Sequence, residues 1–222
     1  MLLAAGRGER MRPLTDHTPK PLLPVQGRAL LDWHIAALLR DGVAQVLVNT
    51  AWLGAHIAQH LDATWRGSPL QLRYSHEQDD FGHALETAGG IARALPQLPP
   101  VFWLAAGDVF VPDFVFDPAA HAAFAASDDL APLLLVPCPA YHPQAPFGLA
   151  AGRALNLPAD SPMPRYTYST IGLFKAALFS APWCALAPGN PTGQAAPLAP
   201  LLRRAMDAGR VGASLYTGRW TD

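Results

Sequence analysis

The feature that most constrains this chain is a glycine-rich stretch close to its first residue. Residues 3–15 read Leu-Ala-Ala-Gly-Arg-Gly-Glu-Arg-Met-Arg-Pro-Leu-Thr. Residues 1–5 are apolar and predict a short buried strand, and Gly6 and Gly8 follow it directly. A glycine has no Cβ, so it permits both a tight turn and a close approach of a phosphate to the main chain. The stretch therefore predicts a phosphate-binding loop in an α/β domain.

Cationic side chains gather around the same loop, namely Arg7, Arg10, Arg12 and Lys20. Exposed backbone N–H groups with nearby cations form a suitable cradle for a triphosphate. The spacing matches neither the G-x-G-x-x-G dinucleotide pattern nor a P-loop, because no Gly-Lys-Ser/Thr follows. A glycine-rich surface turn with solvated arginines is the alternative interpretation of the residues alone.

The run from residue 3 to residue 25, L-A-A-G-x-G-x-R-M-R-P-L-T…P-K-P-L-x-P-V, resembles the signature of sugar-1-phosphate nucleotidyltransferases. That family joins a nucleoside triphosphate to a sugar 1-phosphate and releases pyrophosphate. The resemblance implies catalytic roles for Arg12, Lys20 and Asp108. It also implies nucleotide binding by Leu3, Ala4, Ala5, Gly6, Gly8, Glu9, Arg10 and Lys20.

Hydrophobic periodicity predicts alternating elements along the chain. Helices are expected at 29–39, 56–61, 86–95, 119–126 and 197–208, and strands at 43–49, 70–74, 101–105, 131–137, 166–174 and 215–222. Residues 139–146 are expected to form a loop, and residues 147–149 to be extended. The alternation predicts an α/β fold with a doubly wound, Rossmann-like sheet that is mixed but mainly parallel. We expect a single domain over residues 1–222, with the C-terminus truncated after the last strand.

A second group of residues is assigned to the nucleobase by the same resemblance. Residues 86–91 read Glu-Thr-Ala-Gly-Gly-Ile and begin a predicted helix. In the family such a segment borders the base together with a glutamate at a strand end, which implies base recognition by Glu77, Ala88, Gly89 and Gly90. Two glycines that pack a helix closely onto the sheet are the alternative.

Two carboxylates are candidates for a metal site. Asp108 follows the apolar strand predicted at 101–105, where it could hold a magnesium ion that bridges phosphates, although Gly-Asp is also a common turn. The C-terminal pattern L-A-P-L-L-R-x-A-M…Y-x-G-x-W-x-D, with N-x-A-W-L-G at 49–54 and R-Y-S-x-E at 73–77, resembles bacterial N-acetylmuramate-1-phosphate uridylyltransferases. That resemblance implies Mg²⁺ as cofactor, held by Asp108 and Asp222. A frayed terminal residue is the alternative for Asp222.

Candidate contacts to the sugar are fewer. By resemblance, the strands near residues 147 and 166–174 face the sugar, which implies Phe147, Gly148 and Ser169 as neighbours. Ala106 stands where the family often has an asparagine that contacts the sugar. Ordinary sheet residues are the alternative for each of these positions.

Composition narrows the possible partners. Half of the 222 residues are hydrophobic and the net charge is −1, which does not favour nucleic-acid binding. Cys138 and Cys184 lack metal-site spacing, and no apolar run is long enough for a membrane span. We therefore expect a cytoplasmic protein that binds UTP and a sugar 1-phosphate, with a monomer favoured.

The function that these resemblances imply is transfer of UMP from UTP to N-acetylmuramate 1-phosphate in cell-wall sugar recycling. The alternatives are another hexose-1-phosphate nucleotidyltransferase, acting on glucose with a thymidylyl group or on mannose with a guanylyl group, and a non-catalytic nucleotide-sugar-binding relative.

Overall fold

The computed structural model describes residues 1–139 and 146–222 of the chain. Most of the loop expected at 139–146 lies outside this part. The main strands are β1 (Leu2–Ala4), β4 (Gln45–Thr50), β5 (Gln71–His76), β6 (Val101–Ala106), β7 (Ala131–Pro137), β8 (Gly148–Ala150), β9 (Arg153–Leu155), β10 (Tyr166–Lys175) and β11 (Val211–Leu215). The helices are α1 (Leu30–Arg40), α2 (Gly54–Thr64), α3 (Glu77–Phe81), α4 (Glu86–Ala94), α5 (Pro118–Ala126) and α6 (Ala199–Asp207).

The strands named above form one sheet in the order β5-β4-β1-β6-β10-β7-β11-β9-β8. Strands β5, β4, β1 and β6 run parallel, whereas β10 is antiparallel to both of its neighbours. Strand β11 is parallel to β7. The predicted mixed, mainly parallel, doubly wound sheet is confirmed. A separate hairpin consists of β2 (Pro24–Val25) and β3 (Arg28–Ala29).

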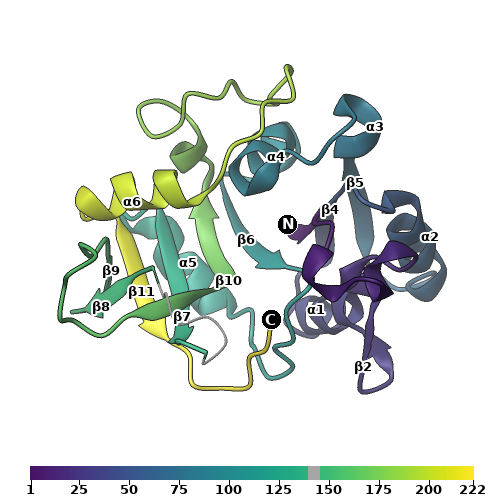
Figure 1. The fold of residues 1–222 in the computed structure, drawn as a ribbon, viewed down its shortest axis with the longest axis horizontal. Coiled ribbons are helices and arrows are strands. Elements are labelled where there is room, and N and C mark those ends of the chain that lie inside the picture. Colours follow the sequence, from purple (N-terminus) through teal and green to yellow (C-terminus); the bar gives the residue numbers. More distant parts are fainter. Residues whose placement is uncertain (140–145) are drawn as a thin grey trace.

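Helices cover both faces of the sheet, which explains why its central strands are almost continuously apolar. Leu31 and Ile35 of α1 pack with Ile57 of α2 in one fully buried cluster. Ile91 of α4 and Leu202 of α6 belong to the cluster on the other face. Figure 1 shows α6 in front of the sheet and α5 behind it.

Short helical turns complete the chain: η1 (Glu9–Met11), η2 (Leu14–Asp16), η3 (Lys20–Leu22), η4 (Leu95–Gln97) and η5 (Ala176–Phe179). Local signals account for helix ends, for example at α5, where the Asp117 side chain accepts from the amide of Ala119 and Pro118 occupies the first turn. No helix within the described ranges is long and apolar enough to cross a bilayer.

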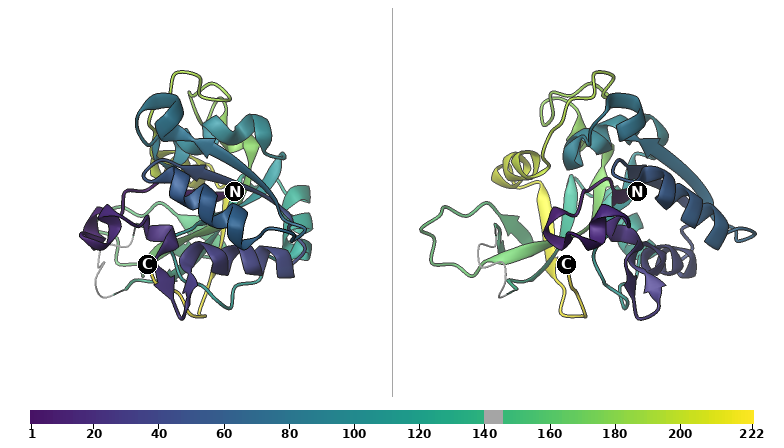
Figure 2. Two further views of the ribbon diagram at one scale, coloured as in Figure 1. Left: turned by 90° about the vertical axis from the view of Figure 1, so that its right-hand side faces the viewer. Right: turned by 45° about the vertical axis from the view of Figure 1, so that its right-hand side comes forward.

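The last strand differs from its prediction, which was wrong in position. Strand β11 ends at Leu215, where the prediction begins, and the following residues are irregular apart from a bridge between Phe110 and Thr221. The spacing of Tyr216, Gly218 and Trp220 resembles strand alternation, but β11 obtains its pairing with β7 from residues 211–215. Figures 1 and 2 show that the chain then runs back to the purple N-terminal loop.

Candidate active site

The sheet order places the glycine-rich loop at the carboxyl end of a central strand, β1. Strand β1 pairs with β4 on one side and with β6 on the other, so the order of the strands reverses at β1. In open α/β sheets such a reversal opens a crevice beyond the carboxyl ends of the strands, where ligands bind. The loop after β1 and Asp108 after β6 therefore meet at one edge of the sheet.

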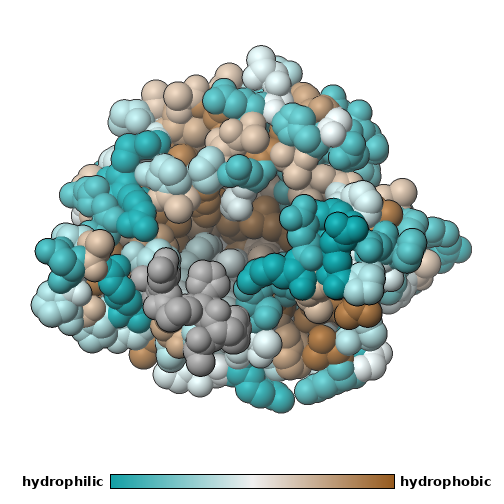
Figure 3. All heavy atoms as spheres, viewed as in Figure 1, coloured by the Kyte–Doolittle hydropathy of each residue, from teal (hydrophilic) through white to brown (hydrophobic). Residues whose placement is uncertain are grey.

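A cavity of about 690 Å³ lies at this edge. Figure 3 shows it as a hollow with an apolar floor and hydrophilic residues along one side. Eight of the predicted site residues line it: Leu3, Ala4, Ala5, Gly6, Lys20, Ala106, Asp108 and Phe147. Its volume is in the range typical of small-molecule and cofactor sites.

The other predicted residues do not line this cavity: Gly8, Glu9, Arg10, Arg12, Glu77, Ala88, Gly89, Gly90, Gly148, Ser169 and Asp222. Asp222 nevertheless contacts Lys20, which lines the cavity, and Arg10 lies 3.7 Å from Asp222.

Lys20 lies between two carboxylates at the rim of the cavity. Its Nζ is 3.0 Å from Asp108 Oδ2 and 2.9 Å from Asp222 Oδ1. Burial disfavours the charge on this ammonium, but the two carboxylates outweigh burial and raise the pKa of Lys20 above its usual value. The predicted residues Lys20, Asp108 and Asp222 are thus brought together from three distant parts of the chain.

Two of these residues fit a divalent cation. The Asp108 and Asp222 carboxylates converge on one cationic atom, the Nζ of Lys20, and hard carboxylate oxygens are the ligands that Mg²⁺ prefers. In protein sites Mg²⁺ is usually held by one or two carboxylates, with waters and substrate phosphates completing its coordination. No cluster of three or more His, Cys, Asp or Glu suited to a metal occurs in the described part of the chain. Two carboxylates would therefore leave coordination positions for waters and for substrate phosphates.

The loop after β1 presents backbone donors. Gly6 is exposed, and a Cβ built on it would meet no atom within 4 Å. Gly8 has a φ of 67°, a left-handed conformation that favours glycine, and a Cβ there would lie 3.0 Å from Thr15. The amides of Gly8, Glu9 and Arg10 donate no hydrogen bond to any other described residue. They are available to an anion.

Glu77 does not line the cavity but supports Asn49, which does. Its carboxylate is fully buried, accepts from Asn49 Nδ2 at 2.7 Å and accepts from the Leu85 amide at 2.8 Å. Asn49 Oδ1 in turn accepts from the amide of Ala4 in β1 at 3.0 Å. Each carboxylate oxygen of Glu77 thus already accepts a hydrogen bond inside the fold, and its predicted contact with a base stays a prediction.

The two glycines of α4 are packing positions. A Cβ on Gly90 would lie 2.4 Å from Glu77 Oε1, and one on Gly89 would lie 2.6 Å from the carbonyl oxygen of Gln194. Ala88, Gly89 and Gly90 are all buried. These positions are closely packed, as the alternative interpretation expected, and the cavity wall here consists of Ala84, Glu86 and Thr87. Their predicted role in base recognition stays a prediction.

Of the four residues predicted to contact the sugar, two line the cavity and two do not. Ala106 and Phe147 line the cavity, whereas a Cβ on Gly148 would clash with Leu157 at 2.6 Å. Ser169 is fully buried in an irregular part of β10, and its Oγ accepts from the Ile171 amide at 3.2 Å. Its neighbours Thr167, Tyr168 and Thr170 line the cavity in its place.

Sequence reasoning missed several lining residues besides these. The missed positions include Pro21, Asn49, Leu198 and Leu202. Asn49 had a signal, because it is a polar residue at the carboxyl end of an apolar strand. Leu198 and Leu202 had none, because a leucine that faces a cavity and one that faces a core share the same helical spacing.

The chain is similar to known nucleotidyltransferases. A family model described as "Nucleotidyl transferase" matches residues 1–152. Over its whole length the chain is 39% identical to an N-acetylmuramate alpha-1-phosphate uridylyltransferase from Neisseria meningitidis, of which the match covers 91%. A protein of the same name from Caulobacter vibrioides is 41% identical over 46% of this chain and 42% of its own length.

A solved structure extends the comparison to the fold. The inositol-1-phosphate CTP transferase from T. maritima superposes with a TM-score of 0.74 and 16% identity, covering all of this chain and 86% of that one. At that identity the likeness concerns the fold, which is that of Rossmann-like nucleotidyltransferases. Together with the match over residues 1–152, it leads to one conclusion: the chain belongs to the nucleotidyl transferase family and is an enzyme of that type.

Proposed function

We propose that this enzyme transfers UMP from UTP to N-acetylmuramate α-1-phosphate, giving UDP-N-acetylmuramate and pyrophosphate in the recycling of cell-wall sugar. The observation that carries the proposal is the 39% identity to the Neisseria enzyme over the entire chain. The cavity at the loop after β1, with Lys20, Asp108 and Asp222 at its rim, supports it.

The chemistry proposed for the site is a single in-line displacement. An oxygen of the sugar phosphate attacks the α-phosphorus of UTP, a new P–O bond forms, and the bond to the β-phosphate breaks as pyrophosphate leaves. No protein nucleophile takes part, so the enzyme contributes positioning and charge neutralisation. Lys20 offsets negative charge around the α-phosphate, while Arg12 and the free amides of the loop hold the leaving pyrophosphate.

Mg²⁺ is the proposed cofactor, and Asp108 and Asp222 are the residues that would hold it. When bound there, it would supply positive charge next to the phosphates that react. Lys20 keeps the two carboxylates close together in the structure, at 3.0 and 2.9 Å from its Nζ. We place the reaction in the cytoplasm, where nucleoside triphosphates are made, and propose that the protein acts as a monomer.

The proposal is tested by incubating the protein with UTP, Mg²⁺ and N-acetylmuramate 1-phosphate and measuring pyrophosphate. We expect release that disappears with EDTA and falls away with glucose 1-phosphate or mannose 1-phosphate. Equal or faster release with TTP and glucose 1-phosphate would instead identify another hexose-1-phosphate nucleotidyltransferase. UTP binding with no release from any sugar phosphate would identify a non-catalytic relative.

A further inference from the structure

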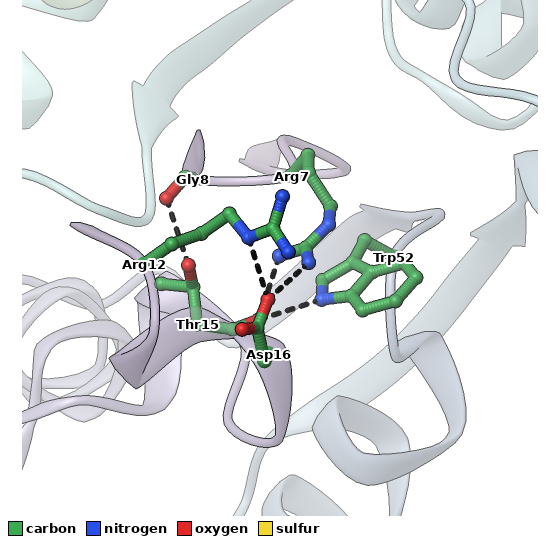
Figure 4. A network of polar contacts seen from close by, with 6 residues as sticks. All are labelled: Arg7, Gly8, Arg12, Thr15, Asp16 and Trp52. Atoms are coloured by element: carbon green, nitrogen blue, oxygen red, sulfur yellow. Dashed lines mark hydrogen bonds and ion pairs between the residues drawn. The ribbon is translucent and has the colours of Figure 1, made fainter. Parts of the chain in front are cut away.

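Arg7 lies in the glycine-rich loop after β1, but its side chain does not line the cavity and contacts three other residues instead. Its guanidinium carbon lies 3.8 Å from the centroid of the Trp52 ring. Its Nη1 donates to the Thr15 carbonyl at 2.7 Å, and its Nη2 pairs with Asp16 Oδ1 at 2.6 Å. Figure 4 shows this arrangement, with Arg7 enclosed by the indole and the carboxylate.

Trp52 is itself fixed by the same carbonyl group. It lies in the turn between β4 and α2, and its Nε1 donates to the Thr15 carbonyl at 2.9 Å. A single backbone oxygen therefore accepts from both Arg7 and Trp52. The contact joins the loop after β1 to the turn after the neighbouring strand, whose register with β1 is set by the sheet.

Thr15 transmits this contact to the loop. It is fully buried, and its Oγ1 donates to the Gly8 carbonyl at 2.8 Å. The left-handed conformation of Gly8 brings its Cα against Thr15 and Lys20, as the 3.0 and 3.2 Å approaches of a built Cβ to those side chains show. The position of the free amides at residues 8–10 therefore depends on where Thr15 is held.

Arg12 differs from Arg7, although both donate to Asp16 Oδ1. The Arg12 side chain is 60% exposed and makes this one contact at 2.8 Å, whereas the Arg7 side chain is 26% exposed and has three partners. An exposed single ion pair contributes little to stability, so Arg12 can leave Asp16 at small cost. Arg7 cannot leave without losing a cation–π contact and two charge-assisted hydrogen bonds.

We infer that Trp52 and Asp16 are positioning residues that hold the Arg7 side chain in one place. The glycine-rich loop after β1 is thereby preorganised for the triphosphate. Arg7 itself then makes no phosphate contact, and Arg12 is the mobile guanidinium that does. This inference rests on the proposed nucleotidyl transfer. It assigns a role to the N-x-A-W-L-G segment, which the reaction itself does not use.

The test separates binding of UTP from turnover. Trp52→Ala and Arg7→Ala should each raise KM for UTP about tenfold and leave kcat within about twofold, since the lost contacts act on nucleotide binding. KM for the sugar phosphate should not change. Trp52→Phe keeps the ring but loses the N–H donor, so its KM for UTP should rise only about threefold.

A double-mutant cycle gives the decisive result. If Trp52 acts through Arg7, the combination of Trp52→Ala with Arg7→Ala should be no worse than either change alone. Additive effects, or a fall in kcat at unchanged KM for UTP, would overturn the inference. Arg28→Ala is the matched control, because Arg28 also makes a cation–π contact, 4.9 Å from the centroid of the Trp33 ring, but lies outside the loop. This variant should leave KM for UTP and kcat unchanged.

Equilibrium binding of UTP to the same variants, measured by calorimetry, keeps the inference separate from the proposed function. A wild-type protein that binds UTP without releasing pyrophosphate would refute the proposed function alone. A Trp52→Ala protein that melts as the wild type does and binds UTP with unchanged affinity would refute the positioning role alone.

Discussion

Single residues at the rim of the cavity carry the charge of the proposed reaction. Lys20→Met removes the only described cation within 3.0 Å of both Asp108 and Asp222, so two carboxylates are left facing each other. We expect turnover to fall at least about a hundredfold, by analogy with the loss of one electrostatic donor. Pyrophosphate release measures the effect, and an unchanged melting temperature would separate it from unfolding. A near-normal rate would remove Lys20 from the mechanism.

Glu77 predicts a dependence of stability on pH. Burial raises the pKa of its carboxyl group, although the amide of Leu85 and the side chain of Asn49 act in the opposite direction. The folded protein therefore keeps this proton at pH values where the unfolded chain, with a pKa of about 4.5, has lost it. The contribution is fully present below that pH and declines as the pH rises through the folded-state pKa.

Urea unfolding of the wild type and of Glu77→Gln across this range checks the expectation. The variant cannot ionise at residue 77, so the wild type alone should lose stability from this group as the pH rises. Curves of identical pH dependence would mean that Glu77 has the same pKa in both states.

The segment after β11 places the Asp222 carboxylate next to Lys20. Trp220 Nε1 donates to the Ser169 carbonyl in the irregular part of β10 at 3.0 Å, and Thr221 pairs with Phe110 in both directions through the backbone. These contacts hold the two residues that precede Asp222 in the chain. The Tyr216 amide still donates to the Leu135 carbonyl of β7 at 2.7 Å, and the chain pairs next with Phe110 through Thr221.

Loss of this anchor should weaken the proposed metal site without touching a metal ligand. We expect Trp220→Ala to raise the Mg²⁺ concentration required for half-maximal rate about tenfold, because Asp222 is no longer held in place. Magnesium titration of the initial rate measures it. Arg219→Ala is the control, since its ion pair with Asp113 is exposed on both sides and should contribute little. Equal shifts in the two variants would exclude a specific role for Trp220.

At the scale of the whole molecule, one sheet carries both hydrophobic clusters. Phe102 and Leu104 of β6 face one cluster, and Ala105 of the same strand faces the other. Neither cluster can lose its packing without disturbing a strand that the other one uses. We therefore expect a single cooperative unfolding transition, with coincident far-UV circular dichroism and tryptophan fluorescence curves. Two separated transitions would divide the chain into two domains.

Ligand binding should appear as global stabilisation. With UTP and Mg²⁺ at about a hundred times the dissociation constant, the native state gains about 2.7 kcal/mol. For a chain of this length that corresponds to a rise of roughly 5–11 °C in melting temperature. Differential scanning calorimetry tests it, with ATP as the competing nucleotide. An equal shift with ATP would argue against selection of the uracil base.

Local patterns in the sequence were sufficient for most of the fold. The helix predicted at 29–39 is confirmed as α1. It could be predicted because Leu31, Ile35 and Leu38 repeat at helical spacing and Gly42, with a φ of 84°, follows the helix end. The glycine-rich loop could be proposed as a phosphate site because its glycines and cations lie close together in the sequence, from Gly6 to Lys20. Contacts over a few residues are set by spacing and conformation, which are properties of the sequence itself.

The contacts between residues far apart in the chain depend on how the elements pack. The sequence could not show that the Glu77 side chain is buried between Asn49 of β4 and Gly90 of α4. Asp222 and Lys20, 202 positions apart, meet because the chain after β11 returns across the sheet. Whether a polar group faces a cavity or another polar group depends on the packing of elements far apart in the chain, and local spacing holds no information about that packing.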